Sequence, residues 1–171
     1  MTNVLVRIEP WSESDLLLLR RTVGDSEMTR YIGGPESEDA LVDRHAGYLK
    51  DAASGDGRMF KIIYEATGDA IGTVGYWDRE DADEAGYEAG WFVVPEFQGR
   101  GVATAATRLA IDRARADGRH RYLHAFPSVE NAASNALCVT LGFALLGPCD
   151  FEYPTGNMLR CNEWRLDLRP A

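Results

Sequence analysis

The sequence predicts a mixed α/β fold of the α+β kind, built on a mostly antiparallel sheet. Two segments near the N-terminus have apolar residues at helical spacing. Three apolar or alternating runs then follow one another with only short polar stretches between them, which predicts an antiparallel meander. A strand–helix–strand order completes the chain. Because no repeat, low-complexity run or linker separates these parts, residues 1–171 are predicted to form a single domain.

The first half of the chain is predicted to hold one strand, two helices and the meander. Residues 4–10, VLVRIEP, are typical of a strand that ends at a proline. Ser12 stands three residues before Asp15, a weak capping box ahead of an apolar helix. A second amphipathic helix starts at Ser37, and a glycine-containing stretch ends it. The meander strands are expected at residues 58–66, 70–78 and 86–94.

The second half is predicted to alternate helices and strands. A helical pattern runs from Val102 to Asp117, and Gly118 stands in the position of a helix C-cap. A short strand at residues 121–126 precedes a helix over residues 131–141, which a glycine also ends. Two further strands are expected in the tail, at residues 143–147 (or 143–153 if the first continues) and 158–168.

Composition and charge exclude several classes of protein. A hydrophobic content of 45% with 26% charged residues is typical of globular chains, so disorder is not expected. The formal net charge of −9 disfavours nucleic-acid binding, which needs a basic surface, and suits a cationic small substrate or peptide. No apolar run approaches membrane-spanning length, and the first residues do not resemble a signal peptide. We therefore expect a cytoplasmic protein that does not bind membranes.

The cysteines and histidines do not form a recognisable metal or triad motif. Cys138, Cys149 and Cys161 are odd in number and widely spaced, which suits neither a zinc knuckle nor a disulfide framework and points to a reducing compartment. His120 and His124 flank a predicted strand with no serine or cysteine motif nearby. No metal site is expected.

The segment of residues 96–106, EFQGRGVATAA, places Gly99 and Gly101 directly before a helix. The first amides of a helix lack intrahelical acceptors and the helix dipole favours negative charge there, so this turn predicts an anion site. A P-loop is excluded because valine and alanine follow Gly101 where a lysine is required. The dinucleotide fingerprint is incomplete at Thr104 and the turn comes too late in the chain. A plain tight turn is the remaining alternative.

The flanks of this turn resemble the GNAT superfamily of N-acetyltransferases. Residues 98–103, QGRGVA, are similar to the superfamily's acyl-CoA pyrophosphate turn, Q/R-x-x-G-x-G/A. The preceding GWFVVPEF resembles its central strand, and NAASNALCVTLGF its second signature. SEMTRYIGGPESEDA and YEAGWFV resemble the branch of ribosomal-protein N-terminal acetyltransferases. The resemblance spans nearly the whole chain and implies a GNAT fold, whose mostly antiparallel sheet splays at the cofactor site and has helices on both faces.

The resemblance also implies acetyl-CoA as the acyl donor and a set of cofactor contacts. Backbone amides of the turn would surround the pyrophosphate, since glycine allows close approach of the chain. The turn residues implied in this role are Gln98, Gly99, Arg100, Gly101, Val102 and Ala103. The strand residues Phe92, Val93 and Val94 would pair with the pantetheine arm, and a backbone amide there would polarise the thioester carbonyl. Asn131 is expected to contact the cofactor, with a helix N-cap as its alternative role.

Two catalytic residues are implied by the resemblance. Attack by an amine needs a general base, and Glu88 matches a glutamate that serves this role in similar proteins; strand alternation puts Glu88, Gly90 and Phe92 on one face. The alternative is a carboxylate on a partly solvated strand. Ser134 matches a serine of the ribosomal-protein branch and could act on the leaving sulfur. Many members have tyrosine where this chain has Cys138, a departure that leaves Ser134 and Cys138 both open as the acid.

The predicted function is transfer of an acetyl group from acetyl-CoA to a primary amine by direct attack in a ternary complex. The acceptor could be a protein N-terminus, a polyamine, an amino sugar or another small amine. Tyr31, Trp77 and Tyr153, together with the acidic surplus, would suit a cationic amine held against aromatic rings. The alternative is a non-catalytic acyl-CoA-binding or regulatory module, which the departure at Cys138 leaves open. A homodimer is also left open.

Overall fold

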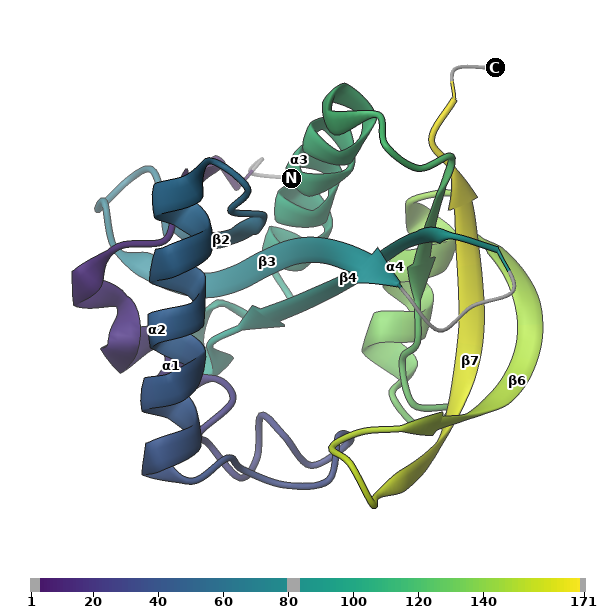
Figure 1. Cartoon of the computed structure of the whole chain (residues 1–171), viewed down its shortest axis with the longest axis horizontal. Coiled ribbons are helices and arrows are strands. Elements are labelled where there is room, and N and C mark those ends of the chain that lie inside the picture. The colour runs from purple at the N-terminus through teal and green to yellow at the C-terminus, as the bar shows by residue number, and fades with distance from the viewer. Residues whose placement is uncertain (1–3, 80–83, 170–171) are drawn as a thin grey trace.

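The computed structural model describes residues 4–79 and 84–169, and within them seven strands form one sheet (Figure 1). The strands lie in the order β1-β2-β3-β4-β5-β7-β6. Every neighbouring pair is antiparallel except β4 and β5, which are parallel. The mostly antiparallel sheet predicted from the sequence is therefore confirmed. The strand bounds are β1 Val6–Pro10, β2 Met59–Tyr64, β3 Ala70–Arg79, β4 Gly86–Val93, β5 Tyr122–Ala125, β6 Ala144–Glu152 and β7 Met158–Asp167.

Helices cover both faces of the sheet, as expected. In Figure 1, α1 and α2 lie in front of the sheet, and α3 and α4 lie behind it. The predicted extension of the first tail strand is also found, since β6 continues to Glu152. The helix bounds are α1 Leu16–Arg21, α2 Glu38–Ser54, α3 Val102–Asp117 and α4 Ala132–Thr140, with short 3-10 turns at Glu13–Asp15 and Pro95–Phe97.

The helix ends follow local signals in the sequence. The Ser37 hydroxyl accepts a hydrogen bond from the amide of Ala40 at 3.3 Å and caps α2. Gly101 and Gly118 flank α3 with φ angles of +80° and +68°, a conformation that glycine adopts without steric cost. The first helix is shorter than its apolar pattern suggests, because the chain turns at Gly24, whose amide bonds to the carbonyl of Leu19 at 2.9 Å.

The core beneath α3 determines which face of β4 is free. Tyr87, Ala89 and Val93 are buried in one cluster with the apolar face of α3. Burying a side chain as large as valine stabilises a fold by about 1.5–3 kcal/mol, so Tyr87 and Val93 strongly specify the orientation of the strand. Because successive residues of a strand point to opposite faces, Glu88 and Phe92 face the side covered by α1 and α2.

The sheet opens where its two halves meet. The parallel strands β4 and β5 are paired only at Tyr87–Leu123 and Glu88–His124. Beyond Glu88, β4 runs on to Val93 without a partner on this side among the described residues, while β5 pairs with β7 on its other edge. The splayed sheet implied by the family resemblance is therefore present.

Candidate active site

The glycine turn before α3 has the shape of an anion cradle. Gly99 and Gly101 have φ angles of +70° and +80°, and a Cβ added at either would meet no described atom within 4 Å. The turn thus faces open space. The first amides of α3 have no intrahelical acceptor, and the positive end of the helix dipole lies here. The side chain of Val102 is buried in the core, so only its backbone is available to the turn.

Gln98 has a different role from its neighbours in the turn. Its amide donates to the carbonyl of Pro95 at 3.2 Å, and its side-chain Nε2 donates to the carbonyl of Val93 at 2.8 Å. Gln98 therefore ties the turn to the end of β4, and its own amide is not free for an anion. Arg100 is exposed, and its guanidinium lies 5.4 Å from the ring centroid of Phe97. This contact keeps a positive charge at the turn.

The open edge of β4 presents backbone groups of alternate residues. The amide of Val94 donates to the carbonyl of Ile71 on β3 at 2.9 Å, so Val94 is committed to the sheet. In the regular antiparallel ladder between β3 and β4, Phe92 likewise points its backbone groups toward β3. The same alternation turns the amides of Trp91 and Val93 toward the open edge. Of the three strand residues named from the sequence, only Val93 offers its amide there, and Trp91 was not anticipated.

Glu88 lies in a niche made by rings on either side of it. Trp77 on β3 and His124 on β5 are its direct cross-strand neighbours. A Cβ on Gly90 would lie 2.9 Å from Cη2 of Trp77, and a Cβ on Gly86 would lie 3.2 Å from Cδ2 of His124. The glycines two residues before and after Glu88 therefore leave room for these rings, which explains the spacing GYEAG.

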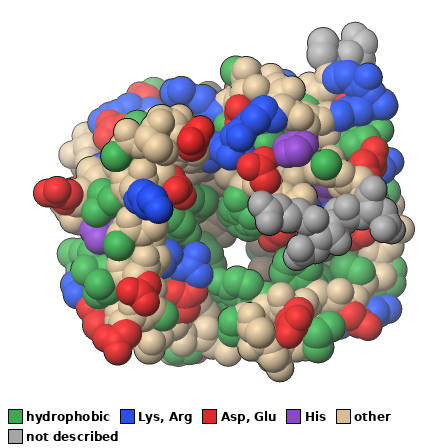
Figure 2. All heavy atoms as spheres, viewed as in Figure 1, with side chains coloured by type: hydrophobic (Ala, Val, Ile, Leu, Met, Phe, Trp, Pro, Cys, Tyr) green, Lys and Arg blue, Asp and Glu red, His purple; other side chains and the backbone are tan. Residues whose placement is uncertain are grey.

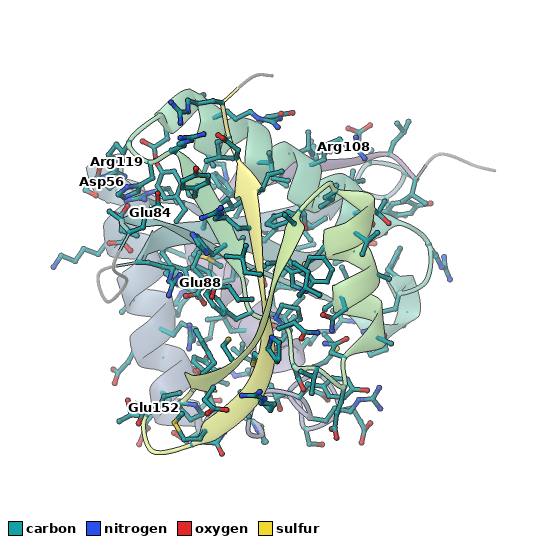
Figure 3. The ribbon with its side chains drawn as sticks, turned by 90° about the vertical axis from the view of Figure 1, so that its right-hand side faces the viewer. Asp56, Glu84, Glu88, Arg108, Arg119 and Glu152 are labelled. Atoms are coloured by element: carbon teal, nitrogen blue, oxygen red, sulfur yellow. The ribbon has the colours of Figure 1, made fainter. Side chains whose placement is uncertain are left out.

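This niche changes the acidity of Glu88. Burial raises the pKa of the Glu88 carboxyl to about 7, while Arg79 and a hydrogen bond from Trp77 act in the opposite direction. Figure 3 shows Glu88 near the middle of the molecule, whereas Arg108 and Glu152 lie at its periphery. A carboxyl with a pKa near 7 can exchange protons at neutral pH, which an ordinary exposed glutamate does far less effectively.

The two candidate acids, Ser134 and Cys138, are on α4, which lies at the opposite face of β4. The indole Nε1 of Trp91 donates to the hydroxyl of Ser134 on α4 at 3.3 Å, so Ser134 lies against the strand with the open edge. Asn131 is the N-cap of α4, and its side-chain oxygen accepts from the amide of Ser134 at 3.1 Å. Cys138 is fully buried, and burial raises the pKa of its thiol to about 12. Ser134 is thus the better placed of the two candidate acids.

A hollow lies in front of the open edge. Figure 2 shows it between α2 and the β6–β7 hairpin, with hydrophobic side chains on its walls. The segment between α1 and α2 meets the hairpin tip at its far rim. There the Nη2 group of Arg44 donates to the hydroxyl of Tyr153 at 3.1 Å, and Arg44 also pairs with Glu36. A Cβ on Gly33 would lie 2.5 Å from the side-chain amide of Asn157, so the two segments touch.

A pocket of about 450 Å³ occupies this rim. Its charged lining residues are Glu36, Asp43 and Arg44, and its hairpin side is formed by Tyr153 and Pro154. Of the aromatic residues proposed for the acceptor from the sequence, Tyr153 lines the pocket and Trp77 lies beside Glu88 with 39% of its surface exposed. Within the described part of the chain, no group of three or more His, Cys, Asp or Glu side chains could hold a metal ion.

The sequence motifs indicated most of the candidate site residues, but not the residues that contact them in the folded chain. The glycine turn, Glu88 and Ser134 lie around the open edge of β4, as their motifs suggested. Arg79 was not anticipated, because nothing in the local pattern of β3 marks a charge that acts on Glu88. Trp91 was treated only as part of an apolar strand, although its ring reaches Ser134.

Comparison with known proteins identifies the family. Residues 6–144 match the family model of the acetyltransferase (GNAT) domain. This chain belongs to the GNAT acetyltransferase family. No curated protein sequence matches it. No helix among residues 4–79 and 84–169 of this GNAT protein is long and apolar enough to span a bilayer.

Solved structures share the fold of this GNAT protein over nearly its whole length. RimL, a ribosomal L7/L12 alpha-N-protein acetyltransferase in complex with coenzyme A, is 17% identical with a TM-score of 0.77, covering 98% of this chain and 96% of RimL. YncA from Salmonella typhimurium with acetyl-CoA is 20% identical with a TM-score of 0.73, covering 99% and 96%. A ribosomal-protein-alanine N-acetyltransferase from Brucella melitensis is 23% identical with a TM-score of 0.74, covering 95% and 99%. At these identities the likeness establishes the fold.

Proposed function

We propose that this protein transfers the acetyl group of acetyl-CoA to a primary amine by direct attack in a ternary complex. The observation on which this depends most is Glu88, a largely buried carboxyl with a pKa near 7, on the strand whose edge is open. A base of this acidity, next to an unpaired strand edge and a glycine cradle, is what acyl transfer to an amine requires.

The donor side of the site has the features that acetyl-CoA needs. The space in front of Gly99 and Gly101 and the unpaired amides of the α3 N-terminus suit a pyrophosphate. The amides of Trp91 and Val93 at the open edge suit the amide groups of a pantetheine arm and the oxygen of a thioester. When bound, acetyl-CoA supplies the activated acetyl group. Arg100 adds positive charge at the turn, and Asn131 orients the first turn of α4 by capping it.

Glu88 projects from one face of β4, and Ser134 of α4 lies against the other face. We therefore assign the two residues to different steps of the reaction. Glu88 accepts a proton from the incoming ammonium group, directly or through water, and leaves a neutral amine that can attack. Ser134 donates a hydrogen bond to the departing sulfur. Cys138 does not take this role, because its thiol is fully enclosed by the core and strongly resists ionisation.

The acceptor enters through the hollow between α2 and the hairpin. The pocket at its rim has the ring of Tyr153 beside the carboxylate of Asp43, while Glu36 is paired with Arg44; a ring and a carboxylate together suit a cationic amine. RimL and the Brucella enzyme are named for acetylating ribosomal proteins, which supports testing protein N-termini as acceptors beside small amines.

The proposal is tested in two stages. Thermal shift with acetyl-CoA, NAD and ATP should show stabilisation by acetyl-CoA alone. Thiol release from acetyl-CoA is then measured over a panel of peptides with free N-termini, polyamines and amino sugars, with the parent protein beside Glu88→Gln and Ser134→Ala. We expect turnover with at least one amine and a marked loss in Glu88→Gln. Tight acetyl-CoA binding without turnover on the whole panel would instead favour the non-catalytic acyl-CoA-binding module.

A further inference from the structure

The strand β3 ends in an arginine that shares the niche of Glu88. Arg79 lies two residues after Trp77, so its side chain projects from the same face of the sheet as Trp77 and Glu88. Only 19% of the Arg79 side chain is exposed. Its guanidinium lies 4.5 Å from the ring centroid of Phe126, a contact that fixes its position across the splayed sheet.

In the part of the chain that the structure describes, Arg79 neighbours two carboxylates, those of Glu88 and Glu163. Its Nη1 atom lies 3.6 Å from Oε1 of Glu163 on β7, and its charge also acts on Glu88, lowering the pKa of that carboxyl. A positive charge nearby favours the ionised form of a carboxyl. The two carboxylates therefore compete for the same guanidinium.

Glu163 is held in place from below by a buried histidine. Nδ1 of His124 lies 3.0 Å from Oε1 of Glu163, and His124 is only 4% exposed. Burial and the charge of Arg79 lower the pKa of His124, so the ring is neutral at neutral pH. A carboxylate can only accept, so Nδ1 carries the proton of the neutral ring and donates it to Glu163. This hydrogen bond fixes the position of the Glu163 carboxylate beside Arg79.

Among residues 4–79 and 84–169, the other groups near Glu88 add no competing charge at neutral pH. Burial raises the pKa of the Cys161 thiol on β7 to about 11 and also raises that of Cys149, its partner on β6. Both cysteines are therefore neutral thiols. Trp77 offers a neutral donor. On α2, across the hollow, Arg44 is already paired with Glu36.

We propose that Arg79 is a positioning residue that keeps Glu88 available as a base at neutral pH, and that Glu163 limits this effect by competing for the same guanidinium. The unit His124–Glu163–Arg79 joins β5, β7 and β3 around a residue of β4. The catalytic meaning of this inference rests on the proposed function, because it assumes that Glu88 is the base.

Substitutions of Arg79 and Glu163 should change the pKa of Glu88 in opposite directions. Arg79→Met removes the cation and keeps an apolar stem, so the pKa of Glu88 should rise by about one unit or more. Glu163→Gln leaves Arg79 to Glu88 alone and removes a negative charge, so the pKa of Glu88 should fall. Arg79→Lys keeps the charge and should restore most of the parent value. A general loss of packing would not produce shifts of opposite sign.

The direct measurement is an NMR titration of the Glu88 side-chain carboxyl carbon in the protein without added ligand, assigned with Glu88→Gln. Arg108→Met is the matched control, since Arg108 is exposed on α3 and lies far from Glu88 in Figure 3. We expect no shift in this control. Equal titrations of Glu88 in Arg79→Met and Arg108→Met would overturn the proposal. If Arg79→Met does not fold, the Glu163→Gln variant provides the test. An unchanged or raised pKa of Glu88 in Glu163→Gln would also overturn the proposal.

The pH dependence of turnover separates this inference from the proposed function. With any amine that the parent protein acetylates, the acidic limb of kcat/KM should move up in Arg79→Met, move down in Glu163→Gln and disappear in Glu88→Gln. A shifted NMR titration with an unmoved acidic limb would support the role of Arg79 and refute Glu88 as the base. If the acidic limb disappears in Glu88→Gln but Arg79→Met changes neither the NMR titration nor the acidic limb, the role of Arg79 is refuted and Glu88 remains the base.

Discussion

The acidity of Glu88 predicts a pH-dependent difference in stability between this protein and its Glu88→Gln variant. Burial raises the pKa of Glu88 from 4.5 to about 7, and unfolding returns it to its ordinary value. The folded chain therefore binds a proton more tightly than the unfolded chain. The stabilisation from this proton is fully present below about pH 4.5 and is lost as the pH rises through about 7. Glutamine does not ionise, so the variant avoids this loss.

The size of the effect follows from the two pKa values. Their difference is about 2.5 pH units, and each unit corresponds to about 1.4 kcal/mol of free energy. Between pH 4 and pH 8 the free energy of unfolding of the variant should therefore rise by about 3 kcal/mol relative to the parent. About 2 kcal/mol of this change should already be present at pH 6. All other titrating groups are common to both proteins and cancel in the comparison.

The assay is urea unfolding of both proteins at pH 4, 6 and 8, followed by tryptophan fluorescence and circular dichroism. Glu130→Gln is a suitable control, because Glu130 is exposed and takes part in no ion pair within residues 4–79 and 84–169. Its free energy of unfolding should stay parallel to that of the parent. A difference between Glu88→Gln and the parent that is constant from pH 4 to pH 8 would refute the reasoning, since it would mean that Glu88 titrates normally in the folded chain.

Three further substitutions test the donor site, the rim of the hollow and the thiol. Gly101→Ala should lower the free energy of unfolding by about 1–2 kcal/mol, because φ at Gly101 is +80°, and should weaken acetyl-CoA binding in calorimetry. Gly118→Ala introduces the same kind of backbone strain at the other end of α3. It should lower stability by a similar amount without weakening acetyl-CoA binding. Tyr153→Phe removes the hydrogen bonds that join Tyr153 to Arg44 and Glu36, which should lower the free energy of unfolding by about 1 kcal/mol. It should also raise KM for the acceptor more than it lowers kcat. An unchanged KM would contradict a role of Tyr153 at the rim. Cys138→Ala should lower the melting temperature yet leave kcat within about twofold, and a large loss of kcat would restore the thiol as the acid.

Much of the fold was predictable because its signals are local. The three-strand meander, α3 and its glycine boundaries, and the capped helix after Asn131 all follow from side-chain periodicity and from residues that favour helix ends. The end of the first helix was not predicted; the turn at Gly24 packs against α2, where a Cβ added at Gly24 would lie 2.9 Å from Cδ1 of Leu41. The structure of residues 80–83, in the connection between β3 and β4, lies outside the described residues.

The sequence by itself determined the family, the glycine turn and the strand that bears Glu88, because each depends on residues next to one another in the chain. Only the tertiary structure decided how those residues behave. It turned the amides of Trp91 and Val93, and not that of Phe92, toward the open edge of β4. It also favoured Ser134 over the buried Cys138 and placed Arg79 beside Glu88. Desolvation and Coulomb energies depend on distances across the sheet, and the groups concerned come from β3, β5 and β7. No local pattern encodes those distances, so the acidity of Glu88 became visible only in the folded chain.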